Sequence, residues 1–199
     1  PLIFLMEKIF GLVSNTRLQD LADPNNKLLR ILAQKAPGTF QHSLQVMNLS
    51  DAAARSIDAN VLLVRAGAMY HDIGKTENPQ CFVENEGVGA KYHDGLTPLE
   101  SAKMIINHVT DGMRLAEKYN LPTIISDFII THHGTSCAAY FYNKYIQEGG
   151  DPANADEFFY KGKKPWTKEQ TILMICDSIE AASRTLKDTS PETFDKFVE

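Results

Sequence analysis

Hydrophobic residues recur along most of the chain at intervals of three and four positions, the spacing of one face of an α-helix. No segment of useful length alternates hydrophobic and polar residues as a half-buried β-strand does, and no internal repeat or low-complexity tract is visible. The pattern therefore predicts an all-α fold, with residues 1–199 forming one domain. We expect residues 1–25 to be roughly a helical lead-in, and the chain to stop inside a helix.

Turn and capping residues indicate where the helices begin. The predicted N-cap residues are Asp23, Thr39, Asn60, Thr97, Thr167 and Ser190. Thr97 and Thr167 are followed three positions later by Glu100 and Gln170, which is the spacing of a capping box. Pro37–Gly38 is typical of a helix stop, so we expect one helix to end there and the next to begin at Thr39.

Composition and charge narrow the class of function. A hydrophobic fraction of 43% over 199 residues is ordinary for a globular domain, and the net charge of −5 excludes a broad basic surface for duplex nucleic acid. Cys81, Cys137 and Cys176 form no C-x-x-C pair, so neither a disulfide framework nor a cysteine zinc site is expected, and a reducing cytoplasmic setting fits. No apolar run approaches the ~18 residues of a membrane span.

Histidine and aspartate residues interrupt the apolar helices near their predicted ends. The segment "YHDIGK" places His71 beside Asp72 after an apolar run, and "DFIITHH" ends in His132 and His133. We expect His108 to close the helix "SAKMIINH". Adjacent helical residues point about 100° apart, so His132 and His133 cannot both lie in the core, yet both can face one ion near the helix end.

A structural role is the alternative for each of these residues taken singly. A lone buried histidine is often a hydrogen-bonded core residue, and the second pair, His93–Asp94, precedes Gly95 and reads as a turn. Asp177, in "LMICDSIEAA", is harder to explain in this way because an uncompensated buried carboxylate is costly. Imidazole and carboxylate ligands together suit iron, manganese or zinc. Five histidines and two aspartates are too many for one ion and about right for two.

The order of His42, His71–Asp72 and Asp177 resembles the H…HD…D signature of the HD superfamily of metal-dependent phosphohydrolases. With the remaining histidines, the pattern is similar to the subgroup that has a two-metal centre. The segments "LLRILAQKAPGTFQHSLQVMNLSDAAA", "YHDIGKTENPQCFVENE", "HDGLTPLESAKMIINHV", "ITHHGTS" and "DSIEAASRTL" resemble the cytoplasmic HD domain of the seven-transmembrane PgpH-type phosphodiesterases. This likeness covers nearly the whole chain.

The resemblance implies an all-α HD-domain bundle that hydrolyses cyclic di-AMP to linear pApA, in a parent protein anchored to a membrane, with residues 1–25 as a juxtamembrane-like lead-in. It also implies two divalent transition metal ions, iron or manganese, with a metal-bound hydroxide as the attacking group. The ligands implied for one ion are His42, His71, Asp72 and Asp177. Those implied for the other are Asp72, His108, His132 and His133, so that Asp72 bridges the two ions. Gln41 departs from the family pattern, since many relatives have a further histidine there.

Two basic residues are candidates for contact with the substrate. Lys75 follows the His71–Asp72 pair closely and could reach the scissile phosphate, although a lysine at a helix C-terminus also interacts well with the helix dipole. Arg184 lies seven residues after Asp177 and could hold the second phosphate through two hydrogen bonds, or pair with Glu180 on its own helix.

Two other functions remain open. An HD domain can sense a cyclic dinucleotide without cutting it, and other HD nucleotide phosphohydrolases share the same metal ligands. The cyclic di-GMP enzymes of the superfamily carry a "DGxGYP" run after the histidine pair, where this chain reads "GTSCAAYF".

Overall fold

The computed structural model of the chain describes residues 12–85, 92–184, 186, 190 and 193. Within these residues the structure is helical apart from loops and one isolated antiparallel bridge between Cys137 and Phe159. The predicted all-α fold is therefore confirmed. No helix in the described part of the chain is long and apolar enough to cross a membrane.

Short connections join α2, α3, α4 and α5, and the 3-10 turns lie in the long segments between α5 and α7 and between α9 and α10. The α-helices are α2 (Asn15–Ala22), α3 (Lys27–Lys35), α4 (Pro37–Ser56), α5 (Val61–Tyr70), α7 (Pro98–Lys118), α8 (Thr123–Thr131), α9 (Ala139–Gln147) and α10 (Lys168–Ser183). The 3-10 turns are η1 (Ile73–Thr76), η2 (Pro79–Cys81), η3 (Val83–Asn85), η4 (His93–Gly95) and η5 (Pro152–Phe158).

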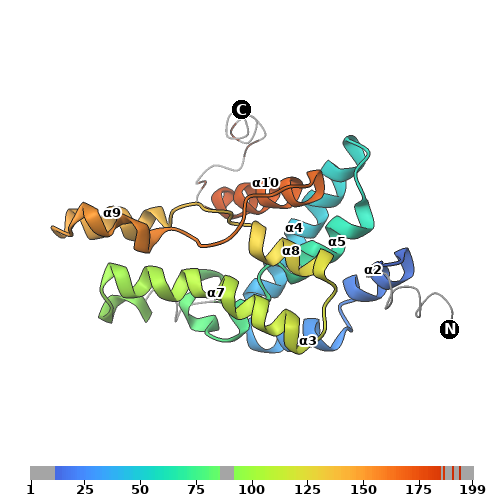
Figure 1. Cartoon of the computed structure of the whole chain (residues 1–199), viewed down its shortest axis with the longest axis horizontal. Coiled ribbons are helices and arrows are strands. Elements are labelled where there is room, and N and C mark those ends of the chain that lie inside the picture. Colours follow the sequence, from blue (N-terminus) through green and yellow to red (C-terminus); the bar gives the residue numbers. More distant parts are fainter. Residues whose placement is uncertain (1–11, 86–91, 185, 187–189, 191–192, 194–199) are drawn as a thin grey trace.

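The helices form a bundle with an extension at one end (Figure 1). Helix α4 packs against α5, α3 and α10, and α5 packs against α2 and α8. Helix α7 runs along the lower side of the view and carries α9 beside its first half (Figure 1). No described residue of α9 is buried, so this helix adds little to the apolar core.

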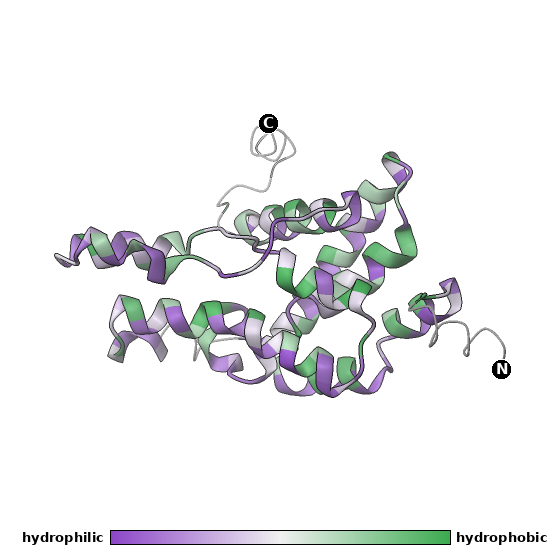
Figure 2. Cartoon of the chain, viewed as in Figure 1, coloured by the Kyte–Doolittle hydropathy of each residue, from purple (hydrophilic) through white to green (hydrophobic). Residues whose placement is uncertain are grey.

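The apolar core is one cluster centred on α4 and α5, with α3 packed on α4, and with α8 and α10 packed on α5. Leu29 and Leu32 of α3, Phe128 of α8 and Leu173 of α10 are almost completely buried in this cluster. Figure 2 shows hydrophobic and hydrophilic positions interspersed along the helices. Full burial of one such side chain stabilises a fold by about 1.5–3 kcal/mol. At the crossing of α5 and α8, a Cβ on Gly67 would lie only 2.5 Å from the Phe128 ring, so only glycine lets these helices approach so closely.

Three predicted helix starts are confirmed and two are wrong. Asn60 and Thr97 cap α5 and α7, Thr97 forms the complete capping box with Glu100, and Thr167 caps α10. In contrast, Asp23 ends α2, because its Oδ1 atom accepts the N–H of Asn25 and closes a turn before α3. The N-cap of α3 is instead Asn26.

The segment at Pro37–Gly38 also differs from the prediction, because it starts α4 instead of ending α3. Pro37 occupies the first turn of α4, where its missing N–H costs nothing. Thr39 lies inside the helix and donates its hydroxyl to Glu84. The box predicted at Thr167 is only half formed, since the Gln170 side chain accepts the N–H of Trp166 instead. The helix predicted from Ser190 lies mostly outside the described residues.

Candidate metal centre

Five helices deliver the predicted histidines and aspartates to one place inside the bundle. Each residue sits at a helix end or on a helix face that points toward the same point. The contributions are His42 from the first turns of α4, His71 and Asp72 from the end of α5, His108 from α7, His132 and His133 from the end of α8, and Asp177 from α10. All are buried except His133, which is half-buried.

His108 corrects one detail of the sequence prediction. It does not close a helix, because α7 continues from Pro98 to Lys118. After His108 the helix keeps a buried face, which includes Val109, Gly112, Leu115 and Ala116. At the end of α8, by contrast, Gly134 adopts a φ of +54°, which turns the chain directly after the histidine pair.

The first cluster of possible ligands consists of His42, His71 and Asp72, whose ligand atoms all lie within 4.8 Å of one another. The Nε2 atoms of His42 and His71 are 3.5 and 3.3 Å from Oδ2 of Asp72. Asp177 closes this group, with its Oδ1 atom 3.0 Å from Nε2 of His42 and 3.7 Å from Nε2 of His71.

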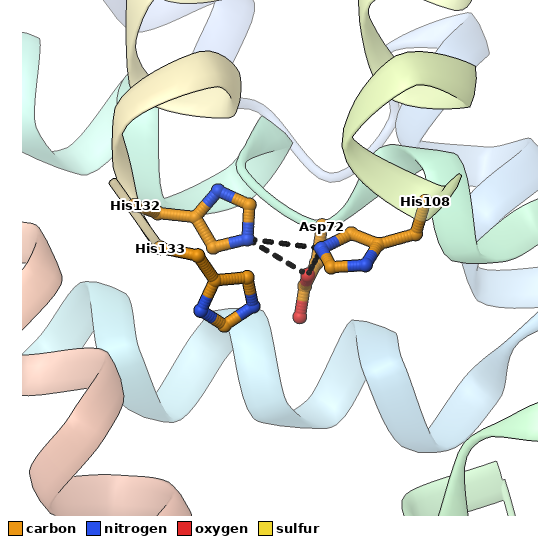
Figure 3. Close-up of side chains that lie close together, drawn as sticks. All are labelled: Asp72, His108, His132 and His133. Carbon is orange, nitrogen blue, oxygen red and sulfur yellow. Dashed lines mark hydrogen bonds and ion pairs between the residues drawn. The ribbon is translucent and has the colours of Figure 1, made fainter. Parts of the chain in front are cut away.

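The second cluster consists of Asp72, His108, His132 and His133, again within 4.8 Å of one another (Figure 3). The Nε2 atoms of His108 and His132 are 3.3 and 3.5 Å from Oδ1 of Asp72 and 3.0 Å from each other. The two carboxylate oxygens of Asp72 therefore face different clusters, and this one side chain joins them.

Backbone carbonyl groups fix how three of the imidazole rings point. Nδ1 of His71, His108 and His132 lies 2.7, 2.6 and 2.8 Å from the carbonyl oxygen three residues earlier in each helix. A carbonyl can only accept, so these contacts assign a proton to Nδ1 and turn the Nε2 atom of each ring toward the centre.

His42 is oriented by a side chain that the sequence did not single out as part of the site. Its Nδ1 atom lies 2.6 Å from Oε2 of Glu180, which is buried on α10. The only sequence signal was the position of Glu180 three residues after Asp177, on the same side of the helix. A carboxylate behind a metal-binding imidazole is a common way to hold the ring and raise its basicity.

Several buried atoms at the centre lack a partner that a cation would supply. Nε2 of His71 and Oδ1 of Asp72 are buried without any hydrogen bond among the described residues. With Nδ1 protonated, the Nε2 atoms of His108 and His132 are two acceptors facing each other at 3.0 Å. Buried unsatisfied polar groups cost about 1–3 kcal/mol each, so a divalent cation bound to these nitrogen and oxygen atoms fits the site well.

Burial and neighbouring charges set the protonation of the donors. Burial opposes ionisation of Asp72, but Lys75 and His71 outweigh it and hold the pKa of Asp72 well below its usual range. Burial also opposes the charged form of His71, yet Asp72 and Asp177 raise the pKa of this ring to about 10. Burial lowers the pKa of His133 well below its usual value. At neutral pH, Asp72 is therefore ionised and His133 is neutral, as metal ligation requires.

The two candidate substrate residues lie at a cavity that opens onto the centre. This cavity of about 610 Å³ is lined by His42, Asp72, Lys75, His133, Asp177 and Arg184, among others. Lys75 donates to Oδ2 of Asp72 and Oε1 of Glu84, both at 2.8 Å. Arg184 donates to Oε1 of Glu180 from two nitrogens, at 2.9 and 2.7 Å, so the Glu180 pairing left open by the sequence is present.

The second His-Asp pair lies away from the clusters. His93 is in the 3-10 turn η4, as predicted, and its Nε2 atom lies 2.9 Å from the carbonyl oxygen of Cys81. It therefore ties a loop together and is not among the residues grouped around either cluster.

The fold and the clustered histidines and aspartates define a known class of protein. Residues 39–182 match the HD domain, and the chain belongs to this family. Within the family it is closely related to PgpH. It is 44% identical to cyclic-di-AMP phosphodiesterase PgpH of Bacillus subtilis over 95% of this chain and 26% of that protein. It is 48% identical to PgpH of Listeria monocytogenes over 91% of this chain and 25% of that protein.

A solved structure extends the comparison. The HD domain of L. monocytogenes PgpH in complex with cyclic di-AMP has a TM-score of 0.83 and 42% identity, covering 88% of this chain and 82% of that one. The expected HD-domain bundle is therefore confirmed. The chain spans about a quarter of the length of the curated relatives it matches.

Proposed function

We propose that this chain is a metal-dependent phosphodiesterase domain that hydrolyses cyclic di-AMP to pApA. The observation that carries the proposal is the pair of ligand clusters joined by Asp72 at the base of an open cavity. The relationship to PgpH, and the solved PgpH domain in complex with cyclic di-AMP, supply the substrate.

In this proposal, the two clusters of imidazole and carboxylate groups form two cation sites. His42, His71, Asp72 and Asp177 would hold one ion, and Asp72, His108, His132 and His133 would hold the other. Iron and manganese both suit these imidazole and carboxylate donors. When bound, such ions supply Lewis-acid polarisation of the phosphate and activation of water at neutral pH.

The residues around the clusters have separate tasks. Lys75 fixes one oxygen of Asp72 and keeps a positive charge at the wall of the cavity, where the scissile phosphate would lie. Arg184 uses one edge of its guanidinium group on Glu180 and is half-exposed toward the cavity, so it remains able to contact the second phosphate. We further propose that this domain lies on the cytoplasmic side of a longer, membrane-anchored protein. The relatives, of which the chain covers about a quarter, support the longer parent.

Turnover by the purified domain tests the proposal. The domain is loaded with manganese or, anaerobically, with ferrous iron, and incubated with cyclic di-AMP and cyclic di-GMP in parallel. We expect two metal ions per chain by elemental analysis, pApA as the product, and faster cleavage of cyclic di-AMP. Faster cleavage of cyclic di-GMP contradicts the substrate, and binding of cyclic di-AMP without cleavage by the loaded protein indicates a sensor.

A further inference from the structure

A second cavity lies directly beside the one that opens onto the metal centre. It has a volume of about 870 Å³ and runs between α4 and α10, so we call it the α4–α10 pocket. His42, Glu84 and Arg184 line both cavities. The α4–α10 pocket is therefore continuous with the candidate metal centre, and Arg184 stands at the border between them.

The outer wall of the α4–α10 pocket is a row of carboxamides. Gln41, Gln45 and Asn48 are spaced four and three positions apart on α4, so they lie on one helix face, and all three line the pocket. All three are exposed, and no hydrogen bond engages their side chains in the described part of the chain. Their amide groups are thus available to a ligand.

The remaining walls suit a flat aromatic ring. Leu49, with 44% of its surface exposed, and the half-buried Ile179 supply apolar contacts on α4 and α10. The carboxylates that line the pocket are already engaged, since Glu180 is paired with His42 and Arg184, and Glu84 with Lys75. Beyond Arg184 at the border, what remains toward solvent is a neutral surface with amide donors and acceptors, which matches an uncharged nucleobase.

From this arrangement we propose that the α4–α10 pocket binds one nucleobase of the cyclic dinucleotide and that its carboxamides select adenine. The inference rests on the proposed function. Each nucleoside of a cyclic dinucleotide is attached to both phosphates, and its base projects outward from the ring. With one phosphate at the metal centre and the other at Arg184, which lines both cavities, one of the two bases can project into this pocket.

The chemistry of the two purines explains the selection. A carboxamide can accept a hydrogen bond from the N6 amino group of adenine and donate one to the ring nitrogen N7 at the same time. Guanine presents two acceptors, O6 and N7, along that edge, so the amide oxygen would face a second oxygen without a proton between them. Gln41 adds one such amide next to His42.

The test compares the two cyclic dinucleotides on the metal-loaded domain. The variant combines Gln41→Ala, Gln45→Ala and Asn48→Ala, and the single substitutions then locate the effect. The ratio of kcat/KM for cyclic di-AMP to that for cyclic di-GMP should fall about tenfold or more, mainly through a higher KM for cyclic di-AMP. Metal content by elemental analysis should equal that of the parent. Gln34→Ala is the matched control, because Gln34 is an exposed amide on α3 outside the pocket, and it should leave the ratio unchanged.

The possible results separate this inference from the proposed function. A parent that prefers cyclic di-AMP, together with a triple variant whose ratio stays within about twofold of it, overturns the nucleobase pocket and leaves the activity intact. A parent that cleaves both substrates equally well also overturns the selection by carboxamides. A parent that loads two metals and cleaves neither dinucleotide overturns both proposals.

Discussion

At the scale of single residues, the centre depends on one carboxylate with two faces. Oδ1 of Asp72 points to His108 and His132, and Oδ2 points to His42, His71 and Lys75. Replacing Asp72 therefore removes a possible ligand from both clusters at once.

We therefore expect Asp72→Ala to remove most of the metal from both clusters, because each loses an anionic donor. His93→Ala, a change in the other His-Asp pair, should leave the metal content close to that of the parent, since the Nε2 atom of His93 bonds a loop carbonyl and its ring packs against Phe141, outside both clusters. Elemental analysis of the purified variants measures both. Loss of metal in the His93 variant with retention in the Asp72 variant would mean that the wrong pair has been assigned.

Glu180 gives a prediction for one cluster only. Glu180→Ala removes the acceptor that holds His42, so metal affinity at the first cluster should fall by about 10–100-fold, as for other carboxylates behind metal-binding histidines. Glu180→Gln keeps an acceptor oxygen and should recover part of this loss. Titration with manganese against a competing chelator measures each site.

The matched control is Glu148→Ala, because Glu148 is exposed and pairs only loosely with Lys144, at 3.9 Å. It should change neither affinity. An equal loss at both clusters in the Glu180→Ala variant would show a general effect on folding and exclude the positioning role.

The raised pKa of His71 predicts how pH affects the stability of the metal-free domain. Its folded-state pKa, about 10, lies above its unfolded value of 6.5. This shift stabilises the fold fully below about pH 6.5, and the stabilisation is lost as the pH rises through about 10. The melting temperature of protein treated with EDTA should therefore fall between pH 7 and 10. Metal-loaded protein should lack this trend, because a cation replaces the proton, and an unchanged melting temperature in the EDTA-treated protein would refute the explanation.

At the scale of the helices, close backbone contact positions the ligands. Gly74 in η1 packs so tightly on α7 that an added Cβ would lie 1.9 Å from the carbonyl oxygen of His108 and 2.5 Å from the N atom of Gly112. Both are backbone atoms of α7 and cannot rotate away. The His71–Asp72 segment can therefore approach His108 this closely only because residue 74 has no side chain.

Gly74→Ala should push α7 outward and carry His108 away from Asp72. We expect a loss of at least 1–3 kcal/mol in the free energy of unfolding, by analogy with overpacked cores, and reduced metal content at the second cluster. Urea unfolding and elemental analysis measure these effects. Gly95→Ala is the control because its Cβ would meet nothing within 4 Å, and it should leave both quantities near those of the parent.

At this scale, the helices could be predicted from the sequence because apolar residues recur at helical spacing. The seven clustered residues could be predicted because histidine and aspartate stand out against these apolar runs. The sequence did not show that Asp23 and Thr39 are not N-caps, because other contacts engage their side chains. Asp23 accepts the N–H of Asn25, and Thr39 donates its hydroxyl to Glu84. The contact between Glu180 and His42 joins positions 138 apart, so no local pattern contains it.

At the scale of the whole molecule, the bundle has an apolar core next to a polar one. The apolar cluster draws on every α-helix of the described chain from α2 to α10 except α9, and the histidines and aspartates join α4, α5, α7, α8 and α10. The polar core contributes stability only when its buried donors are satisfied, so the melting temperature of this domain should report on metal loading as well as on packing.

The distance along the chain between the ligands has a consequence for the order of folding. His42 and Asp177 are 135 positions apart in the chain (177 − 42), so their contact closes a very long loop. Such a contact forms only after the helices have docked, and cations captured there strengthen the native state more than the folding transition state. Adding a chelator should therefore speed unfolding in stopped-flow denaturant jumps and leave the refolding rate nearly unchanged. A slower refolding rate with unchanged unfolding would instead show that the ions are bound before the bundle assembles.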